Sequence, residues 1–318
     1  MDIGPETTVP VQIITWPRGV NVRYMFSWKY VLRSIGVTLA YPSLVVSWLQ
    51  RKDIRVEIHN RRLAEWARIK RRYTDAPKKV LGSKMYLDPN DLTPISSSIG
   101  TSGFLDLPLT CLLTKVLKNS MTFVDVGANI GYYTLLGSKI VGNGGRVYAF
   151  EPETHNFRLL EKSVRENGRA NISVYKLAIS DIDGQVRLFR ASKWQPGGHS
   201  ISKDQGQGFE QVVSTTLDDF WEKNGKPSMD LIKIHVTGDD PLVIAGMGRI
   251  LRESRPKIAM IFDPPKWRGR ETLLALLFQL YDACEIIRSP FLLRRTTLQS
   301  LNQTEARELF LVPKAVTS

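Results

Sequence analysis

The sequence predicts an α/β fold, a doubly wound, mostly parallel sheet of seven main strands with an antiparallel strand at its end. From residue 122 onward, short apolar runs alternate with glycine turns and with segments of helical apolar spacing. Strands separated by helices of roughly 10–15 residues form parallel sheets. The composition, 42% apolar and 24% charged residues, is ordinary for a globular protein and excludes a disordered, collagen-like or polytopic membrane chain.

The elements follow from the spacing of the apolar residues along the chain. Two additional short strands, at residues 186–189 and 211–214, surround a glycine-rich loop at residues 195–198. The expected helices are residues 132–141, 156–167, 241–251 and 271–281. The expected main strands are residues 121–126, 146–150, 172–178, 231–236, 257–262, 284–288 and 308–312.

Residues 1–79 are predicted to form a basic N-terminal extension of helical or mixed structure, and residues 80–318 the α/β domain. The formal net charge is +13, of which the first 100 residues supply +8. Residues 34–50 carry no charge, but a membrane span needs about 20 apolar residues, so an interfacial or domain-packing helix is favoured. Residues 51–79 carry 11 basic and 4 acidic side chains, and their periodicity leaves strand and helix open. An anionic membrane surface is therefore an expected peripheral partner.

The two cysteines, Cys111 and Cys284, are far apart and predict no disulfide framework. The first ten residues begin acidic and lack an apolar stretch after a basic start, so no signal peptide is expected. These features favour a cytoplasmic protein, with peripheral contact at the inner membrane face.

The clearest local motif is VDVGANIGYYT at residues 124–134. A strand ends at Asp125, then Gly127, Asn129 and Gly131 follow, and a helix begins. Glycine adopts backbone torsions closed to other residues, and a helix start presents free N–H groups. This arrangement suits a nucleotide-like cofactor above the end of the strand. The spacing matches neither GxGxxG nor GxxxxGKS/T, which disfavours a dinucleotide or a nucleoside triphosphate.

An acidic residue follows the second main strand. Glu151, in the segment AFEPE, stands about twenty residues after the glycine turn. A carboxylate at this place can accept hydrogen bonds from both ribose hydroxyls. Together, the turn and the acid predict an adenosine-type ligand.

Several segments together resemble the FkbM-type S-adenosylmethionine-dependent methyltransferases of class I. These segments are VDVGANIGYYT, VYAFEPE, LAISD, TTLDDF, DLIKIHVTGDDPLVIAGM and, upstream of them, LGSKMYLDPND. The resemblance covers about residues 80–313. It implies a Rossmann-like class I sheet, methyltransferase activity and S-adenosylmethionine as the cofactor.

The resemblance also implies a set of cofactor-binding residues. Tyr132 opens the following helix and either packs near the cofactor or belongs to the core. The other implied residues are Asp125, Gly127, Ala128, Asn129 and Gly131 at the methionine end, Glu151 at the ribose, and Ser180 and Asp181 at the adenine.

The fourth main strand departs from the family pattern. The family's IKIDVEG reads IKIHVTG here, so His235 replaces an aspartate and Thr237 a glutamate. Lys233, His235 and Thr237 share one face of an alternating strand that ends beside the expected crevice. Because a neutral imidazole accepts protons, His235 is predicted to be the general base, and Asp240 conserves the charge of the family's next acid. Alternatively, His235 is a structural residue in a protein that has lost activity.

A second histidine, His199, lies in the loop segment QPGGHSI, which also looks like the family. It is predicted to position the acceptor, with a surface-loop histidine as the alternative. His59 and His155 have no such context. Four histidines without clustered cysteines or carboxylates predict no metal site.

The leading functional hypothesis is methylation of a hydroxyl on a small molecule, a sugar or a lipid-linked glycan. The second hypothesis is a binding or regulatory protein that retains the cofactor fold without turnover. Methylation of RNA, which the positive charge suggests, ranks third. Nucleic acid is a disfavoured partner because no RNA-binding module is recognised in the first 120 residues.

Overall fold

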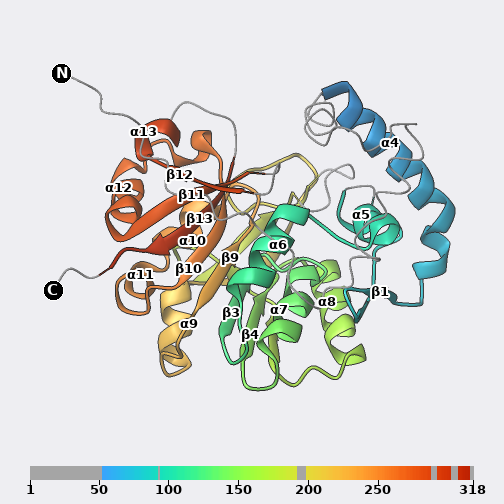
Figure 1. Cartoon of the computed structure of the whole chain (residues 1–318), viewed down its shortest axis with the longest axis horizontal. Helices are drawn as coiled ribbons and strands as arrows, with labels where there is room; N and C mark the ends of the chain where they lie inside the picture. Colours follow the sequence, from blue (N-terminus) through green and yellow to red (C-terminus); the bar gives the residue numbers. More distant parts are fainter. Residues whose placement is uncertain (1–51, 92–93, 192–197, 288–291, 302–306, 316–318) are drawn as a thin grey trace.

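The fold is centred on a mostly parallel sheet (Figure 1). The computed structural model describes residues 52–91, 94–191, 198–287, 292–301 and 307–315. The sheet has eight strands in the order β12-β11-β13-β10-β9-β3-β4-β5. These strands are β3 (Thr122–Val126), β4 (Arg146–Phe150), β5 (Ile172–Tyr175), β9 (Leu231–Ile234), β10 (Lys257–Phe262), β11 (Tyr281–Ile287), β12 (Leu292–Thr296) and β13 (Arg307–Pro313).

Strand directions confirm the predicted class I arrangement. Strands β5, β4, β3, β9 and β10 run parallel to one another, and β13 pairs antiparallel with both β10 and β11. Seven of the eight strands are those expected from the sequence. The eighth, β12, forms an antiparallel hairpin with β11 at the sheet edge. The parallel pairs bring the carboxyl ends of β3, β4 and β9 to one edge.

Helices cover both faces of the sheet, as the term doubly wound implies. Phe123 and Val124 are adjacent on β3, yet they belong to two different buried clusters, because successive side chains of a strand point to opposite faces. One cluster includes side chains of α6 (Leu107–Val116), α7 (Tyr132–Val141) and α8 (Thr154–Glu166). The other includes side chains of α9 (Leu217–Lys223), α10 (Asp240–Ala245), α11 (Gly248–Glu253), α12 (Glu271–Leu280) and α13 (Leu298–Leu301).

The structure divides two elements that the sequence predicted as continuous. The helix expected at 241–251 is the pair α10 and α11, interrupted at Gly246. A Cβ at Gly246 would lie 1.9 Å from the Ser180 carbonyl oxygen, so the chain approaches a neighbouring loop too closely for a side chain there. The strand expected at 172–178 is divided into β5 and β6 (Ala178–Ile179).

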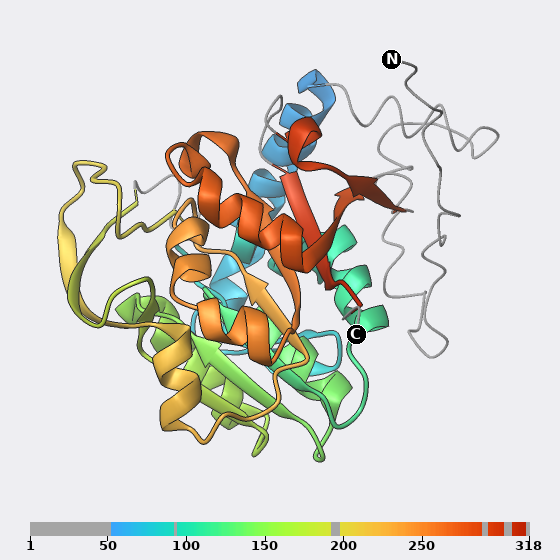
Figure 2. The ribbon, with the colours of Figure 1, turned by 90° about the vertical axis from the view of Figure 1, so that its left-hand side faces the viewer.

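Strand β6 belongs to a second, three-stranded sheet of order β6-β8-β7. Its other members are β7 (Gly184–Phe189) and β8 (Phe209–Thr215), which pair antiparallel. Figure 2 shows this hairpin projecting from one side of the molecule. Between its strands the chain returns to β7, where Phe189 and Ser200 form a backbone bridge. This bridge holds the segment that begins at residue 198 near the carboxyl edge of the main sheet.

The described elements before α6 pack on the face of the sheet that α6, α7 and α8 cover (Figure 1). Helix α4 lies next to α5, and its Trp66 is 1% exposed. The Trp66 ring faces Gly100, where a Cβ would come within 2.1 Å of it. The elements here are α4 (Lys52–Ile69), the 3-10 helix η1 (Lys70–Tyr73), β1 (Lys78–Val80), β2 (Ser83–Met85) and α5 (Pro94–Ser102).

The periodicity of residues 51–79 left strand and helix open, and the structure shows that most of this segment is the helix α4. Strand β1 spans the predicted domain boundary at residues 79 and 80. The uncharged segment 34–50 lies outside the described residues. Among the helices that the structure describes, none combines the length and apolarity required to cross a membrane.

Candidate active site

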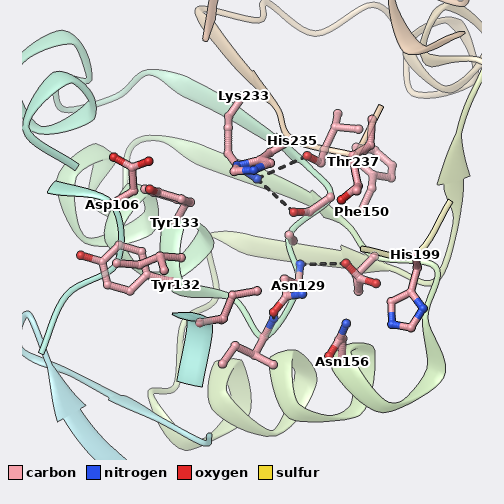
Figure 3. A pocket seen from close by; sticks show the side chains of 18 of the residues that line it. Asp106, Asn129, Tyr132, Tyr133, Phe150, Asn156, His199, Lys233, His235 and Thr237 are labelled. Carbon is pink, nitrogen blue, oxygen red and sulfur yellow. Dashed lines mark hydrogen bonds between the residues drawn. The ribbon is translucent and has the colours of Figure 1, made fainter. Parts of the chain in front are cut away.

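A cavity of about 910 Å³ opens at the carboxyl ends of β3, β4 and β9 (Figure 3). Its volume is in the upper part of the range of about 300–1,000 Å³ that ligand sites occupy. The glycine turn after β3 and the ends of β4, β6 and β9 form its floor and one wall. Residues from α4, α5 and the start of α6 form the opposite wall.

The glycine turn has the backbone geometry that its sequence predicted. Gly127 and Asn129 have φ angles of +73° and +52°. The amides of Gly127 and Ala128 donate to the Phe150 carbonyl at 3.0 and 2.9 Å, which joins the turn to the end of β4. Gly127, Ala128 and Asn129 all line the cavity. Gly131, with a φ of +94°, does not, because it faces Leu160 of α8.

Gly127 also makes room for strand β9. A Cβ there would lie 2.3 Å from the His235 carbonyl oxygen, closer than any real contact, whereas Gly168, which also has a positive φ, has open space. Both Gly127→Ala and Gly168→Ala add a left-handed strain of about 1–2 kcal/mol. We expect Gly127→Ala to lower the free energy of unfolding by a further 1–3 kcal/mol or so, because it also forces an overlap. Urea denaturation of the two variants measures the difference, and equal losses would contradict this role.

Glu151 lies at the end of β4 and lines the cavity. Its carboxylate accepts hydrogen bonds from the amides of Asn129, at 2.7 Å, and Glu153, at 3.0 Å. Burial raises the pKa of Glu151 to about 7, more than the two amides lower it. The side chain is therefore partly protonated near neutral pH. Its charged form, the carboxylate, can accept further hydrogen bonds from a ligand.

The predicted cofactor residue Asp125 lies beneath the cavity and does not line it. It is 0% exposed and accepts a hydrogen bond from the Thr134 hydroxyl at 2.7 Å. Lys233 occupies the wall instead, and its Nζ donates to Asp125 Oδ1 at 2.8 Å and to the Gly127 carbonyl at 3.0 Å. The lysine thus joins β9 to β3 and to the glycine turn. Its place on the polar face of the predicted strand was the signal available in the sequence.

His235 and Thr237 line the cavity with Lys233 (Figure 3), but Val236 lines it too, because β9 ends at Ile234 and the predicted alternation does not extend to these residues. The His235 amide donates to the Val126 carbonyl at 3.2 Å, which holds the end of β9 against β3. Thr237 has a φ of +46°, so the extended backbone has ended there. His235 is half-buried, and its backbone carbonyl lies beside Gly127 of the glycine turn.

His199 lines the cavity from the returning segment of the small sheet (Figure 3). Its Nδ1 accepts a hydrogen bond from the Ala191 amide at 3.2 Å, so a neutral His199 carries its proton on Nε2. Asp239 fixes this segment, because its carboxylate accepts from the Ile201 amide at 2.7 Å and from the hydroxyls of Ser200 and Ser202. Burial raises the pKa of Asp239.

Asp239 is thus a lining residue that the motifs did not indicate, whereas the predicted Asp240 is not among the lining residues. Asp240 is 2% exposed in the first turn of α10, and the Gly238 amide donates to its Oδ2 at 3.2 Å. Its Oδ1 has no hydrogen-bond partner among the described residues, and burial raises its pKa to about 7. Thr237 and Gly238 both have positive φ, so the chain turns before the two acids.

Ser180 and Asp181, which the resemblance implies at the adenine, come directly after the residues that line the cavity. Leu177, Ala178 and Ile179 line the cavity, whereas Ser180 and Asp181 do not. Ser180 is 1% exposed, and its amide bonds to Thr215 of the small sheet. The chain leaves the cavity because β6 pairs with β8 rather than extending β5.

Tyr132 is a core residue, the second of its two predicted alternatives, and its packing near the cofactor stays a prediction. It lines the cavity, and at 4% exposure it also belongs to the buried cluster, with its hydroxyl 3.2 Å from that of Thr110.

Arg62 of α4 and Asn156 of α8 line the cavity without any sequence signal, since they come from elements that meet only in the fold. Within the described ranges no group of three or more histidine, cysteine or acidic residues is placed to hold a metal ion.

The chain resembles several methyltransferases of known structure. It is 11% identical to a putative rRNA methylase from Clostridium thermocellum, over 65% of this chain and 94% of that chain, with a TM-score of 0.40. It is 13% identical to methyltransferase FkbM from Methylobacillus flagellatus, over 89% and 69%, with a TM-score of 0.38. For fibrillarin from Aeropyrum pernix, in complex with natively bound S-adenosyl-L-methionine, the identity is 13% over 74% and 84%, with a TM-score of 0.39.

No curated protein matches the chain. The family profile described as the methyltransferase FkbM domain matches residues 125–284, half of the chain. This match begins at the aspartate before the glycine turn and includes every strand end that borders the cavity. The chain therefore belongs to the FkbM family of methyltransferases.

Proposed function

We propose that the protein transfers a methyl group from S-adenosylmethionine to a hydroxyl group of a small molecule, a sugar or a lipid-linked glycan. The observation that carries this proposal is one cavity at the carboxyl edge of the sheet that both Glu151 and His235 line. S-adenosylmethionine would supply a methyl group that is activated by its sulfonium centre.

The residues at the sheet edge fit a nucleoside. Glu151 presents a buried carboxyl group in the cavity. Two ribose hydroxyls that donate hydrogen bonds to it would favour its charged form. Phe150, Leu177 and Ile179 line the neighbouring part of the cavity and offer apolar surface for a purine base. Gly127, Ala128 and Asn129 of the turn line the cavity next to Glu151 and would lie against the amino acid end.

The remaining space suits an acceptor. Ile95 of α5 and Phe104 and Leu105 before α6 also line the cavity, and they offer apolar surface for the body of an acceptor. His235, directly after β9, lines the same cavity and would remove the proton of an acceptor hydroxyl during transfer. Enclosure in one cavity would hold the hydroxyl oxygen in line with the methyl group.

Glu151→Gln should weaken S-adenosylmethionine binding by about 10-fold or more, since each charge-assisted hydrogen bond contributes about 1.5–3 kcal/mol. Calorimetry measures this loss directly. Glu161→Gln, on the exposed side of α8, is the matched control and should bind like the unmodified protein. Equal affinities for the Glu151→Gln variant and the unmodified protein would remove Glu151 from the cofactor site.

The same carboxyl predicts a pH dependence. Because the pKa of Glu151 in the free protein is about 7, and the ribose hydroxyls favour the charged form, binding releases a proton below that pH. Affinity should therefore fall as the pH drops below about 7 and level off above it. Methylthioadenosine tests this cleanly, because it keeps the nucleoside and lacks the titrating amino acid group. The Glu151→Gln variant should show a flat profile.

One observation favours a second candidate, a cofactor-binding protein without turnover. His235 and Thr237 stand where the family pattern has an aspartate and a glutamate, and Thr237 is exposed at the cavity rim. This candidate shares the cofactor site and predicts tight binding of S-adenosylmethionine without any methylated product.

A further inference from the structure

The part of the cavity wall that α4 and α5 form carries a positively charged side chain. Arg62 of α4 lines the cavity, and its Nη1 donates to the hydroxyl of Ser98 on α5 at 2.7 Å. This bond fixes one edge of the guanidinium group. Trp66, one turn further along α4, anchors the helix in the core and so determines where Arg62 stands.

Arg62 differs from the other strong cation of the cavity in how its charge is balanced. Lys233 is paired with Asp125 at 2.8 Å. Among the described residues no carboxylate forms an ion pair with Arg62, and burial lowers its pKa without a neighbouring acid to oppose the shift. Burying a guanidinium group without an anion is unfavourable. An anion that enters this cavity should therefore bind Arg62 strongly, because it compensates this buried charge.

The acids that line the same cavity are engaged elsewhere. Asp106 caps α6 by accepting from the Leu109 amide, Glu151 accepts from two amides at the sheet edge, and Asp239 holds the His199 segment. These three carboxylates therefore accept hydrogen bonds from backbone amides and do not pair with Arg62. A planar guanidinium fork matches the two oxygens of a carboxylate or a phosphate, and two bonds of this kind are strong and directional.

The surroundings of Arg62 also limit what carries the anion. Ile95, Phe104 and Leu105 line the cavity from the same wall, so the guanidinium group stands at the border of an apolar surface. A ligand that fills this wall combines an apolar body with a single anionic group. A small inorganic anion alone would leave the apolar surface uncovered.

We propose that Arg62, oriented by Ser98, binds a carboxylate or phosphate group on the apolar part of the methyl acceptor. The acceptor is thus an organic anion that places its hydroxyl at His235 and its charge at α4. That this ligand is the acceptor rests on the proposed function. The anion site itself can be tested without the cofactor.

The test is calorimetry on the full chain with phenyl phosphate and benzoate, and with benzyl alcohol as the uncharged analogue. Both anions should bind more tightly than the alcohol, and the tighter of the two identifies the oxyacid group. Arg62→Gln should weaken anion binding by about 10- to 100-fold. Arg62→Lys, which keeps the charge and loses the fork, should bind at an intermediate level. Arg68→Gln removes an exposed charge from the same helix and should leave binding unchanged.

Equal affinity of the Arg62→Gln variant and the unmodified protein would overturn the proposal. Equal losses in the Arg62→Gln and Arg68→Gln variants, or anions that bind no better than benzyl alcohol, would do the same. S-adenosylhomocysteine binding is measured in parallel and should be equal in all these proteins. Its absence from the unmodified protein would contradict the proposed function, while the anion result would stand on its own.

Discussion

Replacing His235 by alanine should lower the rate of methyl transfer by about 100- to 10,000-fold and leave the affinity for S-adenosylmethionine nearly unchanged. His235 lines the cavity, and it is its backbone amide that donates a hydrogen bond to Val126 of β3. Truncation therefore removes the proposed base and keeps the turn in place. Rates are measured as labelled methyl incorporated into extract components, and affinity by calorimetry.

Three further measurements separate a base from a structural residue. With saturating S-adenosylmethionine, which offsets the pH-dependent affinity, activity should still fall in acid, because only a neutral imidazole accepts a proton. His235→Asp restores the family residue and should retain partial activity. His155→Ala is the matched control, since that side chain lies 3.3 Å from Asp88 and outside the cavity. A His235→Ala enzyme with full rate would end the base assignment and direct attention to His199 and Asp239.

Replacing Lys233 by methionine should lower the free energy of unfolding by about 3–5 kcal/mol, because it leaves a buried carboxylate without its partner. The two side chains are 3% and 0% exposed and lie 2.8 Å apart. Lys233 also donates to the Gly127 carbonyl, so the variant should weaken cofactor binding as well. The loss of stability is read from guanidinium denaturation.

The double variant Asp125→Asn, Lys233→Met should recover part of this loss, since it removes both charges together. Lys84→Met provides the matched control, because Lys84 and Glu166 form an equally short ion pair on the surface, with Lys84 59% exposed. Surface pairs contribute about 1 kcal/mol or less. Similar losses for Lys233→Met and Lys84→Met would contradict the assigned importance of the buried pair.

Most of the fold could be predicted from local pattern. Apolar strands such as 146–150 and 257–262 are bounded as expected, because their periodicity and flanking turns are encoded within each segment. The break at Gly246 could not be predicted, since it depends on a close approach to Ser180 from a distant loop. Strand β12 was missed, because its short segment carries two arginines and gains its structure from pairing with β11.

The candidate site was predictable where backbone geometry follows from sequence. Gly127, Asn129 and Glu151 lie around the cavity as a positive-φ turn and a strand-end acid should. The sequence did not indicate which acid lines the cavity where the chain changes direction. Strand β9 ends at Ile234, Thr237 and Gly238 have positive φ, and Asp239 rather than Asp240 then reaches the cavity. Residues from other elements, such as Arg62, follow from packing alone.

The most direct test of the account is to incubate the purified protein with an extract and S-adenosylmethionine that carries an isotope-labelled methyl group. Mass spectrometry should then find labelled methyl ethers on organic compounds that bear a carboxylate or a phosphate, and these products should be absent when the His235→Ala variant is used. Label found only in nuclease-sensitive RNA, or no labelled product from a protein that binds the cofactor, would contradict it.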